Sequence, residues 1–541
     1  MRQALACAAA CLAALSGVWA EGPAAAGAGP APAPAAAAKS GDVVFRADFN
    51  DPVEIKAWSK AAFAEWVGEA GHKTLSVKVP AEEATRDRMI RRTFDLTPYR
   101  GWRLYFECMA KADGVSQPPT RNNGVKYMLD FNTPATGQHW INQNNVFGTF
   151  DWKKISFTVA IPDDATTGTL HLGLQASSGT AWFDHVRVTA FSVPEVRLAP
   201  PRNPAPVYRG HEVPRLRGVM SPVVFRDEDL RVLGQEWKAN LIRWQIQPSG
   251  PGKWSAAGTA VDLAAYDKWI DGKLDELDKV LEACLRYGIK VVIDLHQAPG
   301  GRDENNDLIL LHDAKYQEHF VALWEKIARR YKGNPAVWGY DLVNEPVQSR
   351  PSPEGLGDYV GAQVRAAKAV RAIDPTTPII FEVDQWDDAE AFRYLKPVDI
   401  ANVVYEVHMY WPQAFTHQGI QGPEGVSYPG VIGGRQVDKE ALRRHLQPVR
   451  DFQLAYNVHI YAGEFSAIRW APGESATNYL RDCIDLFEEY GWDWSYHAYR
   501  EWDGWSVEHG SDRNDNKPTA QPTSRKQLLL EWFAKDQKPP G

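Results

Sequence analysis

The chain contains 541 residues with a formal net charge of −8, from 60 Lys and Arg against 68 Asp and Glu. A chain of this length usually forms two or three domains with sizeable cores. The mildly acidic balance provides no basic field, so nucleic acid and anionic membrane surfaces are excluded as expected partners.

Residues 1–20 have the pattern of a secretory signal peptide. Arg2 precedes an apolar run over residues 4–15, and residues 18–20 supply the small side chains of a cleavage site. A lipoprotein signal through Cys11 is the alternative, but the usual aliphatic residue before the modified cysteine is missing. No later segment reaches membrane-spanning length, so we expect an exported protein, secreted or periplasmic, without a membrane anchor.

Two stretches of biased composition divide the rest of the chain. Residues 21–40 are almost entirely Ala, Pro and Gly, which have little to bury and stay extended. Prolines recur towards residue 206, where they prevent a helix or a central strand. We therefore expect linkers at 21–40 and 196–206, with folded domains at 41–195 and 207–541.

Hydrophobic residues alternate with polar ones along short stretches of the first domain. This period of two predicts antiparallel strands with one buried face, packed as an all-β sandwich. The order of elements, with Asp48-Phe49-Asn50-Asp51 early and Trp182-Phe183-Asp184 late, resembles the jelly-roll carbohydrate-binding modules. The alternating stretches cover residues 102–110, 155–159, 170–174 and 186–190.

The resemblance implies two kinds of site in this domain. Asp48 and Asp184 are candidates for holding a structural calcium ion, with turn capping as the alternative. Trp140, Tyr127 and Trp66 are candidate platforms for a sugar ring, with core packing as the alternative for each. Whether the domain binds sugar therefore stays open at the level of the sequence.

Three cysteines follow the signal segment, at Cys108, Cys284 and Cys483. They are odd in number, far apart, and each lies in a core-like pattern. This distribution fits neither a disulfide framework nor a zinc site. Buried free thiols are therefore predicted.

Strand and helix patterns alternate from Arg215 to the end of the chain. One helical pattern carries a hydrophobic stripe at Leu274, Leu277, Leu281, Cys284 and Leu285. Eight strand–helix units predict an α/β fold, a parallel (β/α)8 barrel with its chemistry at the carboxyl ends of the strands. The predicted strands lie near residues 216–220, 240–245, 290–296, 337–344, 379–383, 403–410, 459–464 and 492–499.

Polar side chains end five of these predicted strands. A carboxylate at the end of a buried strand is unfavourable unless it is paired or has a function. A lone histidine or arginine has a structural explanation, but a whole set at one end of a barrel indicates a site. Glu345 and Glu464, on different strands, supply the two carboxyl groups that glycoside hydrolysis requires. The full set is Arg243, His296, Asn344, Glu345, His408, Tyr410 and Glu464.

The motifs around these residues resemble those of glycoside hydrolase family 5, the cellulase-like retaining enzymes. Asn344-Glu345-Pro346 follows the fourth strand, His408-Met409-Tyr410 ends the sixth, and Gly463-Glu464 ends the seventh. Arg243 and His296 match the arginine after strand two and the histidine after strand three. The resemblance extends over nearly all of the second domain.

This resemblance implies a double-displacement mechanism that needs no cofactor. Glu464 would attack the anomeric carbon, while Glu345 would protonate the leaving oxygen and then activate water. Arg243 and Tyr410 would keep Glu464 ionised. Asn344 would hold the sugar 2-hydroxyl.

Further residues are expected to bind the substrate. His296 and His408 would line the subsite of the two glutamates. The chain contains 21 tryptophans, of which Trp386, Trp411 and Trp502 are the candidate stacking walls, with core packing as the alternative for each.

One position departs from the family. A tryptophan usually ends the eighth strand and lies beneath the sugar, but His497 stands there in this sequence. Trp502 would then supply the ring from slightly further along the chain. The platform residue and the substrate subgroup stay open.

Two classes of function remain. The first is a retaining hydrolase of a β-linked glycan, for which family frequency favours β-1,4-glucan over β-mannan, another β-glucan or exo-action. The second is a catalytically inactive carbohydrate-binding protein. Glu345 and Glu464 together favour the enzyme, because binding needs neither carboxylate. We expect a monomer whose partner is a poly- or oligosaccharide.

Overall fold

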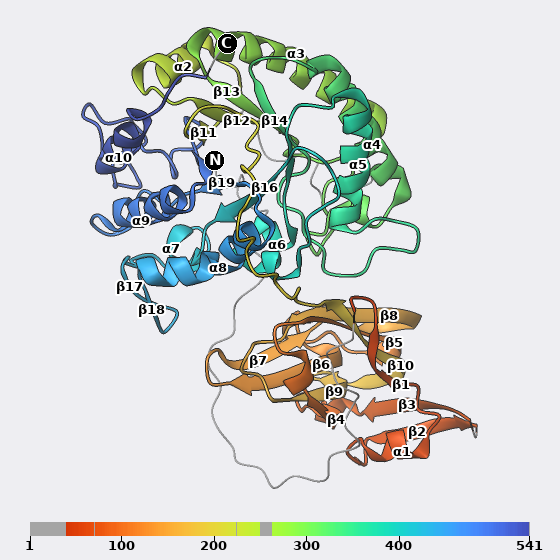
Figure 1. Ribbon diagram of the computed structural model, residues 1–541. Helices are drawn as coiled ribbons and strands as arrows, with labels where there is room; N and C mark the ends of the chain where they lie inside the picture. Colours follow the sequence, from red (N-terminus) through yellow and green to blue (C-terminus); the bar gives the residue numbers. More distant parts are fainter. Residues whose placement is uncertain (1–38, 70, 223, 249–261, 540–541) are drawn as a thin grey trace. The chain divides into compact units, whose positions relative to one another are not determined.

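The computed structural model describes residues 39–69, 71–222, 224–248 and 262–539, which form two compact units (Figure 1). Among these residues, one unit runs to Pro194 and includes Ser349–Pro351. The other begins at Glu195 and contains the rest. The predicted signal peptide and nearly all of the predicted linker at 21–40 lie outside the described residues.

The amino-terminal unit consists of two antiparallel sheets. The larger sheet has the strand order β2-β3-β10-β5-β8 with β1 paired to β10, and the smaller has the order β4-β9-β6-β7. The strands are β1 Val43–Ala47, β2 Ala64–Glu69, β3 His72–Val79, β4 Arg88–Asp95, β5 Arg103–Val115, β6 Gly124–Thr133, β7 Gly137–Asn142, β8 Gly148–Ala160, β9 Thr167–Gln175 and β10 Gly179–Ser192; helix α1 covers Pro52–Lys56.

The core of this unit follows the predicted alternation. Leu170, Leu172 and Leu174 of β9 are fully buried, and the rings of Phe106 and Phe157 stack at 5.0 Å between centroids. Alternating apolar residues from both sheets therefore form one interior, as expected for packed sheets. The all-β prediction is confirmed.

The three candidate sugar platforms have different environments. Tyr127 is fully buried in the core, so the prediction that it stacks on sugar is wrong. Trp66 packs on Phe49 at 4.7 Å between ring centroids and is partly buried. Trp140 in β7 is 57% exposed. Its ring alone among the three is free to meet a ligand.

Asp184 lies among nitrogen and hydroxyl groups. Its carboxylate accepts from the backbone N–H of His185 (2.7 Å) and lies 3.7 Å from His72 Nε2. Calcium prefers several oxygen ligands, and none of the described carboxylate and histidine groups close enough to hold a metal includes Asp48 or Asp184. The calcium site stays a prediction.

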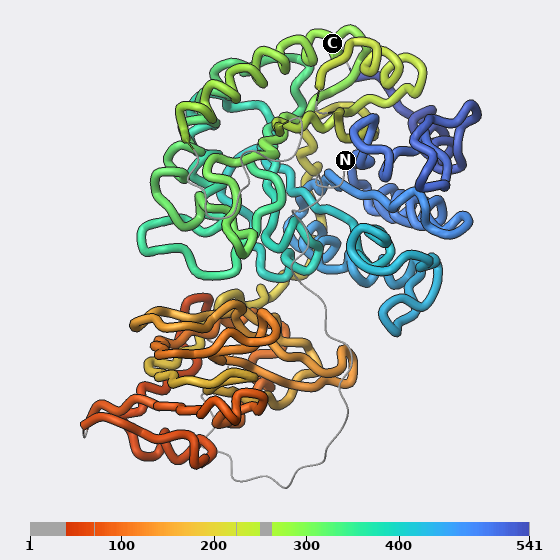
Figure 2. The backbone as a smooth tube through the Cα atoms, turned by 180° about the vertical axis from the view of Figure 1, so that it is seen from behind, coloured from red at the N-terminus to blue at the C-terminus, as the bar shows by residue number. Residues whose placement is uncertain are grey.

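The second unit is a closed barrel of eight parallel strands, confirming the predicted (β/α)8 architecture. Helices surround the strands when the molecule is seen from either side (Figures 1 and 2). The barrel strands are β11 Arg217–Met220, β12 Leu241–Gln245, β13 Lys290–Asp294, β14 Val337–Asp341, β15 Ile379–Phe381, β16 Val403–Met409, β19 Ile460–Phe465 and β20 Asp493–Tyr496. The hairpin β17 Gly430–Ile432 and β18 Arg435–Val437 lies outside the barrel.

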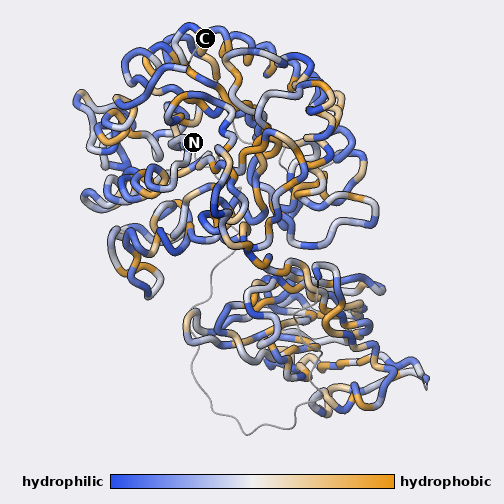
Figure 3. The backbone as a smooth tube through the Cα atoms, in the orientation of Figure 1, coloured by the Kyte–Doolittle hydropathy of each residue, from blue (hydrophilic) through white to orange (hydrophobic). Residues whose placement is uncertain are grey.

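The helices have amphipathic faces that cover the barrel, and hydrophobic residues gather along the enclosed strands (Figure 3). In α3, Leu274, Leu277, Leu281 and Cys284 are buried, but Leu285 is 45% exposed, so including it in the stripe was wrong. The helices are α2 Asp227–Arg231, α3 Leu263–Tyr287, α4 Ala314–Tyr331, α5 Tyr359–Ile373, α6 Asp384–Asp387, α7 Gln413–Thr416, α8 Lys439–Tyr456, α9 Ser475–Tyr490 and α10 Ser524–Phe533.

All eight predicted strands are present, but several are shorter than expected. β13 ends at Asp294 and β14 at Asp341, so His296 and Asn344 lie in the loops that follow. The apolar pattern continues for one or two residues beyond each strand, through Leu295 and through Leu342 and Val343, but these residues already belong to the loops. The polar residues therefore lie just beyond the strands as well as in them.

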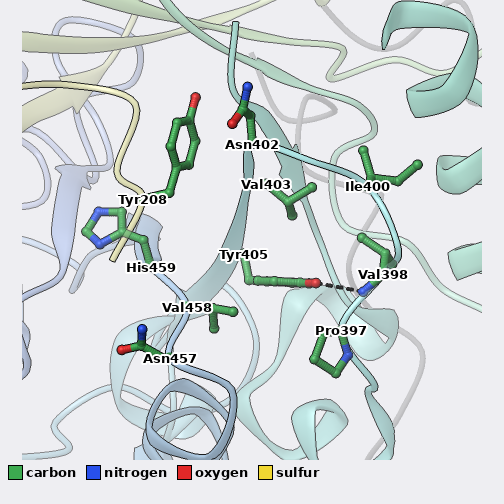
Figure 4. A pocket seen from close by; sticks show the side chains of 10 residues that line it. All are labelled: Tyr208, Pro397, Val398, Ile400, Asn402, Val403, Tyr405, Asn457, Val458 and His459. Carbon is green, nitrogen blue, oxygen red and sulfur yellow. Dashed lines mark hydrogen bonds between the residues drawn. The ribbon is translucent and has the colours of Figure 1, made fainter. Parts of the chain in front are cut away.

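The amino-terminal ends of the strands are occupied by structural contacts. Asp493 accepts hydrogen bonds from His211 Nε2 (2.7 Å), His459 Nε2 (2.6 Å) and the N–H of Leu216 (2.8 Å). A nearby cavity of about 180 Å³ has mostly apolar walls, where the Tyr405 hydroxyl accepts from the N–H of Val398 (Figure 4). The hydrogen bonds to Asp493 tie the starts of β19 and β20 to the segment that precedes β11.

The three cysteines Cys108, Cys284 and Cys483 are buried free thiols, as predicted. Among the helices that the structure describes, none is both long enough and apolar enough to cross a membrane.

Candidate active site

The polar residues singled out in the sequence converge at the carboxyl ends of the barrel strands. Arg243 lies in β12, His408 in β16 and Glu464 in β19, while Glu345 follows β14. Donor atoms of Glu345, His408 and Glu464 all lie within 4.8 Å of one another. Retaining glycosidases hold their two carboxyl groups about 5–5.5 Å apart. The two carboxyl groups thus lie on the same side of the barrel and close enough to act on one glycosidic bond.

Glu464 is buried among three hydrogen-bond donors. Arg243 Nη1 donates to Oε1 (2.7 Å) and the Tyr410 hydroxyl donates to Oε2 (2.7 Å). His497 Nδ1 lies 3.2 Å from Oε2. Burial alone would raise the pKa of Glu464, but His408, His497 and Arg243 together hold it well below its ordinary value. The carboxylate is ionised and aimed into the site.

The residue before Glu464 has to be glycine. A Cβ at Gly463 would lie 1.4 Å from Oε1 of Glu406 on the neighbouring strand. Glu406 is fully buried, so it has no space to move aside. The Gly463-Glu464 pair in the sequence therefore reflects the close packing of the buried Glu406 carboxyl group against Gly463.

Glu345 is more accessible than Glu464, with 22% of its side chain exposed. His408 Nδ1 lies 3.1 Å from its Oε1, and the other nitrogen of that ring lies 3.2 Å from Glu406. Burial opposes a charge on His408, but Glu464 and Glu382 raise its pKa well above the ordinary value. A protonated His408 thus lies between Glu345 and Glu406 and offsets the repulsion between their carboxyl groups.

Arg243 is fully buried and contacts more carboxyl groups than the sequence suggested. Besides Glu464, it donates to Asp341 (2.9 Å) and Glu382 (2.8 Å), and it lies 3.2 Å from both Asp294 and Glu406. Burial, with Glu406 close by, raises the pKa of Asp341 well above its ordinary value. Asp294, Asp341 and Glu406 lie in apolar strands, which was the available sequence signal.

His497 lies beside Glu464. Its ring stacks on Trp505 (centroids 5.1 Å apart) and lies 2.6 Å from the Tyr410 hydroxyl through Nδ1. Nε2 lies 2.9 Å from Glu501. Burial would lower the pKa of His497, but the charges of Glu501 and Glu464 raise it to about 10. An imidazolium ion thus stands where an apolar ring was expected.

Glu501 and Trp505 were missed in the sequence. Glu501 also accepts from Gln245 Nε2 (3.1 Å). Gln245 is the last residue of β12, and β11 lies between β12 and β20 in the barrel. Trp505 packs edge-on against Tyr410 at 5.0 Å. Both lie in the loop after β20, and the density of aromatic and charged residues from Trp502 to Trp505 was the only sequence signal.

The remaining predicted binding residues lie around this centre. His296 Nδ1 is 2.8 Å from Asp294, and Asn344 Oδ1 accepts from Arg243 Nη2 (3.1 Å). The ring of Trp386 lies under the guanidinium of Arg302 at 4.6 Å. The site thus joins His296 and Asn344 directly to the buried acid cluster.

The other two candidate walls are further from the glutamates. Trp411 stacks on His445 (centroids 4.9 Å apart) and lines a cavity of about 630 Å³. Trp502 is partly buried and lies 6.1 Å from Trp505, so one ring separates it from His497. Each of these tryptophans therefore has packing partners as well as an exposed part.

Two groups of side chains here have donor atoms close enough to hold a metal ion. They are Glu345–His408–Glu464 and Glu382–Glu406–His408. The Arg243 guanidinium contacts Glu464, Glu382 and Glu406. Its positive charge therefore neutralises part of the negative charge of these carboxyl groups.

Comparison with known proteins agrees with this geometry. Residues 208–503 match the family model described as cellulase, glycosyl hydrolase family 5. Endoglucanase C of Acetivibrio thermocellus is 29% identical over 253 residues, which is 41% of this chain and 72% of that protein. Cellodextrinase A of Ruminococcus flavefaciens is 27% identical over 41% of this chain and 66% of its own length.

Solved structures with a similar backbone include endoglucanase Cel5A from Thermotoga maritima. It is 23% identical, covers 59% of this chain and 96% of its own, and has a TM-score of 0.44. The family model spans more than half of the chain and contains both glutamates and every polar residue at the strand ends. The chain belongs to glycosyl hydrolase family 5.

Proposed function

We propose that this protein hydrolyses a β-1,4-linked glucan with retention of the anomeric configuration. The observation that carries the proposal is the approach of Glu345 and Glu464 to within 4.8 Å, with Glu464 held as a carboxylate. The endoglucanase relatives support glucan as the substrate. A relative named β-xylosidase, 26% identical, leaves other β-linked glycans for a substrate screen to separate.

The first step would form a covalent glycosyl-enzyme. Glu464 Oε attacks the anomeric carbon as the bond to the leaving oxygen breaks, and the carboxyl group of Glu345 transfers its proton to that oxygen. Arg243, Tyr410 and His497 orient the attacking carboxylate by hydrogen bonds. Their donors favour its ionised form before the attack and again when it leaves.

The second step would reverse these roles. Glu345, now a carboxylate, takes a proton from water as the water attacks the anomeric carbon and displaces Glu464. His408 Nδ1, 3.1 Å from Glu345, stabilises the carboxylate that forms after the first proton transfer. Two inversions at one carbon give net retention.

Replacing each glutamate separates the two roles. Glu464→Ala should abolish turnover for every leaving group, because no covalent intermediate forms. Glu345→Ala should still react with a dinitrophenyl glycoside, whose leaving group needs no proton, and should accumulate the intermediate. Azide, which needs no deprotonation, should then restore turnover and give a glycosyl azide of unchanged configuration. On substrates whose leaving group needs a proton, Glu345→Ala should lower the rate about 10²–10⁴-fold, because general acid–base catalysis is lost.

Wild-type enzyme provides the stereochemical control for this pair. NMR of the first product should show the anomeric configuration of the substrate. Inversion by the wild type, or azide rescue of Glu464→Ala with retention, would contradict the assigned roles.

The His497–Glu501 pair predicts the alkaline limit of activity. His497 is protonated below its pKa of about 10, so kcat/KM on a dinitrophenyl glycoside, whose leaving group needs no proton from Glu345, should fall as the pH rises through that value. Glu501→Gln removes a negative charge that raises this pKa, and should move the alkaline limb of kcat/KM down by about 1–3 pH units.

The matched control is Glu508→Gln, because Glu508 pairs with Arg500 and Lys526 rather than with His497. It should leave the limb in place. An unchanged limb in Glu501→Gln would assign the alkaline transition to another group, such as Tyr410.

The amino-terminal unit offers a second contact with glycan. Trp140 is 57% exposed and pairs across strands with Asp130, whose carboxylate lies 2.5 Å from His171 Nε2 and accepts from Gln138 (3.3 Å). An exposed ring beside polar groups suits the apolar face and the hydroxyls of a sugar. This face supports a carbohydrate-binding role, and the signal-like residues 1–20 support export.

Trp140→Ala in the full-length protein should weaken adsorption to insoluble glucan about tenfold, or about 1.4 kcal/mol. Hydrolysis of short soluble substrates should not change. Trp152→Ala is the control, since Trp152 is 40% exposed on the other sheet. Unaltered adsorption of Trp140→Ala, or an equal loss in both variants, would rule out this face.

A further inference from the structure

We propose that Glu382, directly after β15, is a positioning residue. It holds the backbone of Glu345 in place and connects it to Arg243, which donates to Glu464. The inference rests on the proposed roles of the two glutamates. No sequence motif pointed to Glu382, which follows the short apolar strand Ile379–Phe381 and is 1% exposed.

The carboxylate of Glu382 accepts two hydrogen bonds from different parts of the site. Oε2 accepts from the backbone N–H of Glu345 (2.5 Å), and Oε1 accepts from Arg243 Nη2 (2.8 Å). Arg243 Nη1 in turn donates to Glu464 (2.7 Å). One side chain therefore joins the backbone of the proton donor to the arginine that orients the nucleophile.

Glu345 needs such an anchor because of its backbone conformation. Its φ is +49°, in the left-handed region that residues with a side chain seldom adopt. Arg302 Nη2 donates to its carbonyl oxygen (2.7 Å), while Glu382 holds its N–H. The guanidinium of Arg302 and the carboxyl group of Glu382 thus fix the peptide groups on either side of this residue, and Glu382 is the one that also reaches Arg243.

Glu382 is itself fixed from outside the barrel. Gln363 of α5, which is buried, accepts from the N–H of Glu382 (3.2 Å) and donates to its carbonyl oxygen (2.8 Å). The side-chain amide therefore replaces a strand neighbour at the point where β15 ends. The chain of contacts runs from Gln363 through Glu382 to both catalytic glutamates.

An amide at position 382 cannot reproduce these contacts. A glutamine has one acceptor oxygen and an NH₂ group that only donates. Either the N–H of Glu345 or Arg243 Nη2 would then face another donor. If the Glu345 backbone moves, proton transfer to the leaving oxygen suffers, while attack by Glu464 on a substrate that needs no proton suffers much less.

The test is the leaving-group dependence of Glu382→Gln, measured as kcat/KM on aryl cellobiosides. For leaving groups that need protonation the loss should be about 10²-fold, against less than about tenfold for dinitrophenolate. Asp341→Asn is the matched control. Asp341 contacts the same arginine at 2.7 Å but is not a partner of the Glu345 backbone, so its losses should be equal for both leaving groups.

Gln363→Met covers the case in which Glu382→Gln does not fold, because it acts from outside the site. It should show the same leaving-group split in a weaker form. Equal losses for both leaving groups in Glu382→Gln and Gln363→Met, or the same split in Asp341→Asn, would overturn the positioning role.

Wild type and Glu345→Ala, assayed on the same aryl cellobiosides with and without azide, separate this inference from the proposed function. Absence of wild-type turnover, or of azide rescue, would refute the proposed roles of the glutamates. Normal behaviour of both, together with no split in Glu382→Gln, would refute only the role of Glu382.

Discussion

The site depends on one buried cation. Arg243 has no solvent exposure, and its guanidinium contacts the carboxyl groups of Asp294, Asp341, Glu382, Glu406 and Glu464. Removing an arginine from water is strongly unfavourable unless charged partners and hydrogen bonds replace its hydration. The five acids come from five other barrel strands or their ends, so the same contacts that satisfy the arginine fix the relative positions of those strands. One of the acids is Glu464, the proposed nucleophile, so its position is set by the barrel strands.

The two glutamates obtain different properties from this arrangement. Glu464 is buried, but the charges of His408, His497 and Arg243 hold its pKa well below the ordinary value, and the Tyr410 hydroxyl also donates to it. Glu345 follows its strand, reaches solvent, and is held through its backbone by Glu382 and Arg302. Retaining hydrolysis needs one carboxylate that stays charged and one group that exchanges protons with the leaving group and water. Under the proposed roles, the burial of Glu464 and the accessibility of Glu345 divide these tasks between two residues of the same kind. His497 strengthens the division, because an imidazolium beside Glu464 favours its charged form where an aromatic platform would not.

The barrel and the central residues follow from the sequence because they depend on local patterns. Apolar strands ended by Asn344-Glu345-Pro346 or Gly463-Glu464 specify both the fold and the two carboxylates, and Arg243 and Tyr410 stand out for the same reason. Glu382, Glu501 and Trp505 do not stand out, since their roles arise from contacts between strands and loops that are distant in the chain. Tyr127 shows the opposite error. Its position in an alternating strand is compatible with either face of the sheet until the pairing register is known. In the observed register its side chain lies on the buried face. The predicted calcium site depends on several oxygen ligands meeting in space, which spacing along the chain does not specify.

The identity of the nucleophile is tested most directly by trapping the covalent intermediate. A 2-deoxy-2-fluoro-β-cellobioside with a dinitrophenolate leaving group reacts to form the glycosyl-enzyme quickly but releases it slowly, because fluorine destabilises both transition states. Mass spectrometry of the digested protein should find a single added sugar, and fragmentation should place it on Glu464. A label on any other carboxylate, or turnover without a label and with inverted configuration, would contradict the assignment of Glu464 and the double-displacement mechanism with it.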